Sequence, residues 1–108
     1  MKTHKIRFAR RVYDQIESIA VYITSINTVE SSIRYINSLI DEILTLSYRA
    51  DTIPKLQWET QYVIYPDTKR LLVKKGILSV FFVIYQDYVI VYDIVPSSLV
   101  TKEADSTI

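Results

Sequence analysis

The sequence of 108 residues contains no cysteine, one histidine, one glycine and one tryptophan. The absence of cysteine excludes a disulfide scaffold, thiol catalysis and thiolate metal sites. A single glycine leaves no glycine-rich phosphate loop, and one histidine without cysteine does not assemble a typical zinc site. We therefore expect no cofactor and no metal ion, and we expect the histidine, His4, to be exposed on the surface and inert.

Long hydrophobic runs are also missing. The longest apolar stretch lies within Ile77–Tyr85, and Gln86 and Asp87 separate it from the next one, Tyr88–Val95. A membrane helix needs about 20 apolar residues, and the basic N-terminus lacks the apolar run of a secretory signal. These features predict a cytoplasmic protein that does not enter a membrane.

Neither sign of charge dominates the composition. Lys and Arg number 13 and Asp and Glu number 12, so the formal net charge of +1 does not identify a nucleic-acid binder. The two signs are nevertheless segregated, because residues 1–11 and 69–75 carry only basic charges whereas residues 14–67 are net acidic. Such segregation indicates an anionic or acidic partner, with an ordinary solvated surface as the alternative.

The apolar content of 49% fits a single small globular domain. We place this domain at residues 1–98 and expect a mobile polar tail over 99–108. Residues Lys5–Phe8 alternate as a short strand, and apolar spacings of three and four then predict two helices. The first spans about 9–26, and the second begins with a capping box of Asn27 and Glu30 and ends near Leu46 or Ser47. The short link between them predicts an antiparallel helical hairpin.

The second half of the sequence predicts a sheet. Residues 48–66 have no clear period and predict mostly loop, with a short strand or turn around Tyr62–Tyr65. Three segments rich in β-branched and aromatic residues then predict strands: Lys69–Lys75, Ile77–Tyr85 and Tyr88–Val95. Gly76 and the pair Gln86-Asp87 separate these strands, and Pro96 ends the last one. The predicted class is α+β, in the order β-α-α-β-β-β, with the helical hairpin on one face of a mainly antiparallel sheet.

The last two predicted strands are apolar on both faces. Val80, Phe82 and Ile84 alternate with Phe81, Val83 and Tyr85, and then Tyr88, Ile90, Tyr92 and Ile94 alternate with Val89, Val91, Asp93 and Val95. Two helices shield only one face of a sheet. The other face is therefore covered by the loop 48–66, with Trp58 and Tyr62, or it forms a groove that meets another chain.

Residues 4–98 resemble the RelE/ParE superfamily of toxins from bacterial type II toxin–antitoxin systems. The resemblance rests on four stretches: HKIRFA at 4–9, the basic-led strand KRLLVKK at 69–75, the aromatic strand VFFVIY at 80–85 and the aliphatic strand VIVYDIV at 89–95. It implies a toxin that inhibits bacterial growth, as in plasmid stabilisation. It also implies a cognate antitoxin, whose extended or helical segment wraps the helices and the sheet and holds the toxin inactive.

The resemblance implies one of two activities. Some members cut mRNA on the ribosome, and others poison DNA gyrase without acting as nucleases. In many members the tyrosine corresponding to Tyr85 is followed by arginine, whereas this chain has Gln86. The last strand often continues into a histidine-containing stretch, where this chain has Pro96, Ser97 and Ser98. These departures favour the ParE-like, gyrase-directed activity.

A ribosome-dependent endoribonuclease is the main alternative. Cleavage of RNA without a metal needs a base, a cation and an acid. Arg70 and Lys74 would then contact phosphate, and Tyr85 or Tyr92 would lie near the attacked bond if its pKa of about 10 were lowered. No base is evident, and both tyrosines also fit ordinary core or rim positions. A second alternative is a degenerate, non-toxic binding or dimerisation module, and a homodimer remains open under each hypothesis.

Overall fold

The computed structural model of the protein describes residues 3–101. Its helices are α1 (Arg10–Ile26), α2 (Val29–Leu44) and the short α3 (Leu46–Arg49), and its strands are β1 (Lys5–Phe8), β2 (Lys69–Val73), β3 (Leu78–Tyr85) and β4 (Tyr88–Pro96). Turns of 3-10 helix follow at Ala50–Thr52 and Ser97–Leu99. The predicted α+β class and element order are confirmed. Of the expected C-terminal tail, residues 102–108 lie outside the described residues.

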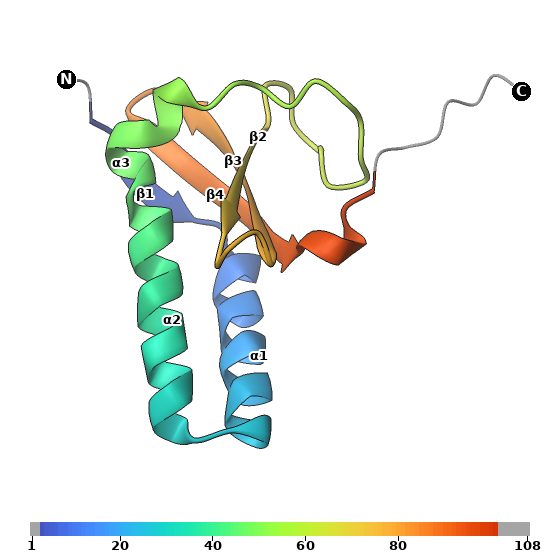
Figure 1. Cartoon of the computed structure of the whole chain (residues 1–108). Coiled ribbons are helices and arrows are strands. Elements are labelled where there is room, and N and C mark those ends of the chain that lie inside the picture. Colours follow the sequence, from blue (N-terminus) through green and yellow to red (C-terminus); the bar gives the residue numbers. More distant parts are fainter. Residues whose placement is uncertain (1–2, 102–108) are drawn as a thin grey trace, which may run out of the picture.

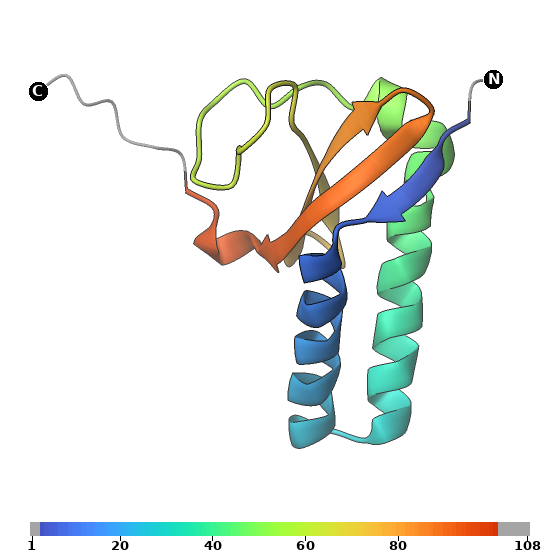
Figure 2. The same cartoon turned by 180° about the vertical axis from the view of Figure 1, so that it is seen from behind.

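The sheet has four strands in the order β1-β4-β3-β2. Strands β2, β3 and β4 form the predicted antiparallel meander, and β1 pairs with β4 in parallel. Helices α1 and α2 form the predicted antiparallel hairpin and lie against one face of the sheet (Figure 1). The far half of this hairpin extends beyond the sheet, as both views show (Figure 2).

The start of α2 differs from the predicted capping box. Thr28 is the N-cap residue, and its hydroxyl accepts a hydrogen bond of 3.0 Å from the backbone N–H of Ser31. The side chain of Asn27 instead accepts from the backbone N–H of Thr28 at 2.9 Å. The predicted capping box of Asn27 and Glu30 is therefore wrong. The N-cap is one residue later, at Thr28, because Thr28 has the extended backbone that an N-cap needs.

The loop after the hairpin begins later than predicted. Helix α3 and the 3-10 turn carry helical structure to Thr52, where the sequence predicted a loop from Tyr48 onward. No strand forms at 62–65, although a turn does at 61–62. A single antiparallel bridge between Lys55 and Lys69 joins the loop to the start of β2.

Both hairpin turns use residues with left-handed backbone. Strand β2 ends at Val73, two residues before the predicted end, because Lys74, Lys75 and Gly76 have φ angles of 52°, 58° and 84° and form the turn. The predicted break at Gly76 is confirmed. The tight connection at Gln86 and Asp87 is also confirmed, and it holds Gln86 at a φ of 55°.

Two apolar clusters lie on opposite faces of the sheet. The larger one faces the helices and centres on buried residues of α1, α2, β3 and β4: Val12, Leu39, Ile43, Val80, Phe82, Val89, Val91 and Ile94. The smaller one contains Phe81, Tyr92 and Val95, and residues from the loop and the C-terminal segment pack against it, among them Leu56, Tyr62 and Val100. The loop thus covers part of the second face, as one of the two alternatives predicted. Another part stays open, since Tyr85 is 61% exposed.

A β-bulge in β4 changes the predicted alternation. Phe81 pairs with Asp93 and Phe82 pairs with Val91, so Tyr92 is the extra residue. After the bulge, Ile94 joins the helix-side core with Val91, and Val95 joins Tyr92 under the loop. The prediction that Ile94 shares a face with Tyr92 is therefore wrong.

The bulge coincides with a polar contact to α1. Gln15 donates to the buried carboxylate of Asp93 at 2.6 Å, and its side-chain carbonyl accepts from the N–H of Ile94 at 2.9 Å. These two hydrogen bonds satisfy groups on consecutive residues that a regular strand would point in different directions. They hold the start of α1 against the sheet.

Candidate functional site

The four residues predicted for a nuclease site lie at different places. Arg70 is the second residue of β2, on the face that the loop partly covers, and Lys74 lies in the β2–β3 turn. Tyr92 is buried at the bulge, and Tyr85 is exposed at the end of β3. Arg70 pairs with Phe81, four residues before Tyr85. At about 3.3 Å per residue, this separates Arg70 and Tyr85 by roughly 13 Å along the sheet.

Arg70 is held by neutral groups. Its Nε donates to the hydroxyl of the buried Ser79 at 3.0 Å, and its guanidinium lies 5.6 Å from the centre of the Trp58 ring. Ser79 in turn contacts Ser97 at 2.8 Å. Partial burial lowers the pKa of Arg70 from its ordinary value, although a guanidinium stays protonated at neutral pH.

Lys74 is engaged with α2. Its ammonium lies 4.4 Å from the centre of the Tyr35 ring and donates to Ser38 at 2.9 Å. Its backbone N–H donates to both carboxylate oxygens of Glu42, at 3.1 and 3.2 Å. Lys74 therefore fixes the β2–β3 turn to the helix, on a different side of β2 from Arg70.

Tyr92 is 3% exposed beneath the loop. Its hydroxyl donates to the backbone carbonyl of Tyr62 at 2.7 Å and lies within hydrogen-bonding distance, 2.9 Å, of the Thr68 hydroxyl. Burial is the largest cause that raises the pKa of Tyr92 above its ordinary value. Proton transfer near neutral pH requires the opposite shift, so this environment suits a structural hydroxyl that holds the loop on the sheet.

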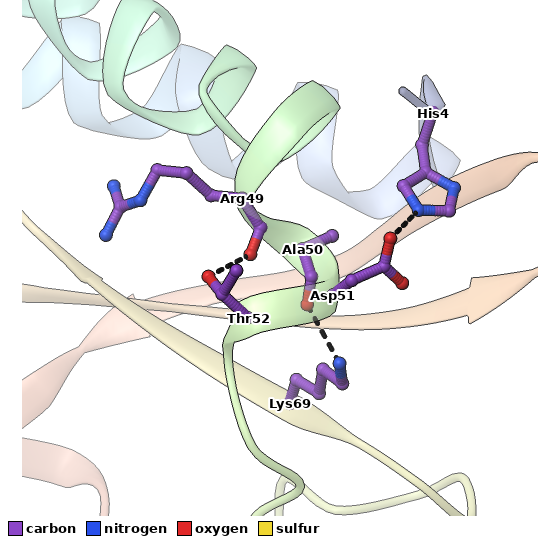
Figure 3. Close-up of polar contacts among 6 residues, drawn as sticks. All are labelled: His4, Arg49, Ala50, Asp51, Thr52 and Lys69. Atoms are coloured by element: carbon purple, nitrogen blue, oxygen red, sulfur yellow. Dashed lines mark hydrogen bonds and ion pairs between the residues drawn. The ribbon is translucent and has the colours of Figure 1, made fainter. Parts of the chain in front are cut away.

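His4 is not exposed, and that prediction is wrong. The residue is 5% exposed, its Nε2 lies 2.8 Å from a carboxylate oxygen of Asp51, and its backbone N–H donates to the carbonyl of Ser47 at 2.7 Å. Figure 3 shows this pair beside Lys69, whose ammonium donates to the carbonyl of Ala50 at 2.8 Å. These bonds join the N-terminal segment and β2 to the α3 region. No local sequence signal indicated the contact, because Asp51 lies 47 positions from His4.

The open part of the second sheet face is basic and aromatic. The guanidinium of Arg7 lies 4.3 Å from the centre of the Tyr88 ring and donates to its hydroxyl at 3.2 Å. Tyr85 pairs with Tyr88 across the β3–β4 hairpin, and Lys5 pairs with Tyr88 from β1. This part of the sheet therefore presents basic and aromatic groups together.

An apolar groove lies elsewhere, between the hairpin and the β2–β3 turn. It has a volume of about 540 Å³, and Ile19, Tyr22 and Ile23 of α1, Tyr35 of α2 and Ile77 of the turn contribute to its walls. Tyr22 is 64% exposed and Ile77 is 62% exposed. An exposed apolar groove beside two helices has the shape and chemistry that receive an amphipathic helix.

The tip of the hairpin continues this apolar surface. Residues 18–29 contain no charged side chain, and Val21, Ile26 and Val29 are each at least 60% exposed. This uncharged stretch was not identified as a surface from the sequence, because only the helical spacing of the apolar residues was considered. The hairpin tip therefore carries an exposed apolar surface without charged side chains.

Within residues 3–101, no group of three or more His, Asp or Glu side chains is placed to hold a metal ion. None of the helices in this part of the chain is both long and apolar enough to cross a membrane.

Comparisons with known proteins give a structural similarity without a sequence match. No family model matches the chain, and no curated protein matches it by sequence. A solved structure titled "Chromosomal ParDE TA system from P. aeruginosa" is similar, with a TM-score of 0.74 and 12% sequence identity over 87% of this chain and 96% of that chain. The chain therefore has the same fold as that structure, as the sequence resemblance implied.

Proposed function

We propose that this protein is the toxin of a bacterial type II toxin–antitoxin system. It acts in the cytoplasm on DNA gyrase through surface contacts, without cutting RNA, and a cognate antitoxin neutralises it. The observation that carries this proposal is the ParE-type fold over nearly the whole chain. Because fold alone does not determine function, the proposal also rests on two surfaces of this particular chain.

The first surface is the apolar groove beside the hairpin. The exposed side chains of Tyr22 and Ile77 flank it, and the uncharged residues 18–29 extend it. Covering such a surface with the apolar face of a helix removes it from water, which favours binding by about 25 cal/mol per Å² of apolar area. This supports a helical antitoxin segment as the occupant of the groove.

The second surface is the open basic and aromatic part of the sheet. The guanidinium of Arg7 already contacts the ring and the hydroxyl of Tyr88, which reduces the side-chain entropy that is lost when this pair contacts a partner. This surface lies on the face of the sheet opposite the helices, so an antitoxin segment in the groove beside the hairpin would not occupy it.

Two findings favour contact over RNA cleavage. Arg70, Lys74 and Tyr85 do not converge, and burial raises the pKa of Tyr92. Within residues 3–101, the only hydrogen-bond partner of the Arg70 side chain is the neutral hydroxyl of Ser79. The gyrase-directed activity therefore fits this chain better than the ribosome-dependent nuclease.

Inducible expression in a bacterial host tests the proposal. We expect growth arrest, relief of the arrest by co-expression of the adjacent reading frame, and no codon-phased cuts when translating mRNA is analysed by primer extension. Codon-phased cuts that vanish in Arg70→Ala would replace this proposal with the nuclease. Harmless overexpression would favour a non-toxic binding module.

Lysine substitutions in the groove test the antitoxin surface separately. Tyr22→Lys and Ile77→Lys place a charge on the apolar wall, so we expect both variants to stay toxic but to escape relief by the co-expressed antitoxin. Leu44→Lys is the matched control, because Leu44 is an exposed apolar residue of α2 that does not line the groove. Equal relief of all three variants would contradict the assignment of the groove.

A further inference from the structure

We propose that the chain binds a small amphiphilic anion, a single alkyl chain with a phosphate head, beside the helical hairpin. The head group lies between Arg34 and Lys74, and the alkyl chain lies in the neighbouring groove that Ile19, Tyr22 and Ile77 line. The inference concerns the free protein and holds whether or not the protein is a toxin. It rests on a cationic pocket, on an apolar groove and on the residues that line both.

The head-group pocket lies between α2 and the β2–β3 turn. Its volume is about 360 Å³, and Ser31, Arg34, Tyr35 and Ser38 of α2 line it together with Lys74 of the turn. Spacings of three and four residues place the α2 side chains next to one another on one side of the helix. The residues that line the pocket therefore include two cations and no carboxylate, which favours an anionic ligand.

No carboxylate neutralises the two cations of this pocket. Within residues 3–101, neither Arg34 nor Lys74 takes part in an ion pair. The ammonium of Lys74 donates to the hydroxyl of Ser38 at 2.9 Å and lies 4.4 Å from the centre of the Tyr35 ring, so two of its three N–H donors remain for a ligand. The carboxylate of Glu42, one turn after Ser38, accepts instead from the backbone N–H of Lys74. The exposed guanidinium of Arg34 adds a planar set of donors that matches phosphate oxygens.

The apolar groove is adjacent to this pocket. Ser31 and Tyr35 line both hollows. The groove has a volume of about 540 Å³, and no charged residue is among those that line it. A ligand that fills both hollows must therefore be negatively charged at one end and apolar along the rest of its length.

These features favour a single amphiphile over a membrane surface. Binding to an anionic bilayer usually uses several Lys or Arg residues beside the apolar face, but residues 18–29 carry no charge. The apolar site is a groove, and such a hollow buries most of the surface of a small ligand. The antitoxin helix proposed above would contact the same walls, so the helix and the amphiphile would exclude each other.

The test uses the full chain and soluble probes, each below the concentration at which it forms micelles. The probe is n-octyl phosphate. In the controls, n-butyl phosphate shortens the alkyl chain, n-octyl glucoside replaces the charged head with a neutral one, and inorganic phosphate has no alkyl chain. Isothermal titration calorimetry measures Kd, and backbone amide NMR shifts of Arg34 and Ile77 report the two hollows.

We expect one molecule of n-octyl phosphate to bind per chain, with shifts at both Arg34 and Ile77. Its Kd should be about tenfold or more below those of n-butyl phosphate and inorganic phosphate, because the longer chain buries more apolar surface. It should also be about tenfold or more below the Kd of n-octyl glucoside, because hydrogen bonds to charged groups are the stronger ones.

Two variants test the head-group pocket. Arg34→Gln and Lys74→Gln should each weaken the binding of n-octyl phosphate about fivefold or more. Lys75→Gln is the matched control, because Lys75 is an exposed lysine of the same turn that does not line the pocket. Arg34→Gln keeps the test decisive if Lys74→Gln fails to fold, since Arg34 is exposed and takes part in no ion pair within residues 3–101.

A third variant tests the groove. Ile77→Ala should weaken the binding of n-octyl phosphate by a larger factor than that of n-butyl phosphate, because it removes apolar surface from the wall that contacts the alkyl chain. Leu72→Ala is its matched control, because Leu72 is also an exposed apolar residue but does not line the groove.

Several results would overturn the proposal. They are equal binding of n-octyl phosphate and any of the three control probes, and unchanged binding to Arg34→Gln. Binding to phosphatidylglycerol vesicles without binding to monomeric n-octyl phosphate would also overturn it, since the apolar surface would then be a membrane contact. Growth and gyrase activity are not measured in this experiment, so its result is independent of the toxin assignment.

Discussion

Replacing Tyr92 with phenylalanine removes one buried hydroxyl and leaves the ring in place. That hydroxyl bonds to the carbonyl of Tyr62 and contacts the hydroxyl of Thr68, so Tyr92→Phe leaves polar groups of the loop without this partner. A net loss of about 1–2 kcal/mol is expected for such a change. In a domain of this size each kcal/mol lowers the Tm by roughly 4–8 °C.

Thermal unfolding followed by circular dichroism measures this effect. Tyr85→Phe is the matched control, because Tyr85 is 61% exposed and its hydroxyl has no protein partner in residues 3–101; its Tm should stay within about 1 °C of the parent. Thr68→Val combined with Tyr92→Phe should cost less than the sum of the two single changes, since both remove the same contact. Equal Tm values for Tyr92→Phe and Tyr85→Phe would refute the view that Tyr92 holds the loop on the sheet.

The same hydroxyl also predicts an alkaline dependence of stability. Burial raises the pKa of Tyr92 in the folded chain above the ordinary value of about 10 that holds in the unfolded chain. Its contribution is therefore fully present below pH 10 and is lost as the pH rises through the folded-state pKa. Urea denaturation at pH 8 and pH 11 should show a smaller alkaline loss for Tyr92→Phe. A part of the loss should remain, because burial also raises the pKa of Tyr35.

Two further substitutions test the turn and the bulge. Gln86→Gly should stabilise the fold by about 0.5–1 kcal/mol in urea denaturation because a φ of 55° strains a residue with a Cβ; Asp87→Gly, at a position without positive φ, should give no such gain. Gln15→Ala should destabilise by about 2–4 kcal/mol, since it removes a charge-assisted bond to the buried Asp93 and leaves the N–H of Ile94 without its acceptor. A loss below about 0.5 kcal/mol would mean that water replaces both bonds.

Patterns that repeat along the chain predicted the architecture. The helical period of α1 and α2 can be seen in residues that are close in the sequence, and so can the apolar runs of β3 and β4. The packing of these elements in the fold agrees with both patterns. The bulge at Tyr92 could not be predicted this way, because it coincides with a contact to Gln15, 78 positions from Asp93. The burial of His4 depends on Asp51 in the same manner.

The candidate surfaces were only partly predictable. The surplus of apolar strand faces predicted that the second face is either covered by the loop or open, but not that Arg7 of β1 lies on Tyr88 in the open part. The groove beside Tyr22 was not predicted either, because the period of α1 does not reveal that its far half extends beyond the sheet. Arg70 was identified as a cation from its place in a basic strand, but the absence of a counter-ion is a property of the folded chain.

The most direct measurement of the central claim is DNA supercoiling by purified gyrase in the presence of this purified protein. We predict that supercoiling falls as the protein is titrated in and recovers when the product of the adjacent reading frame is added. Full supercoiling at concentrations of the protein that arrest growth would contradict the account.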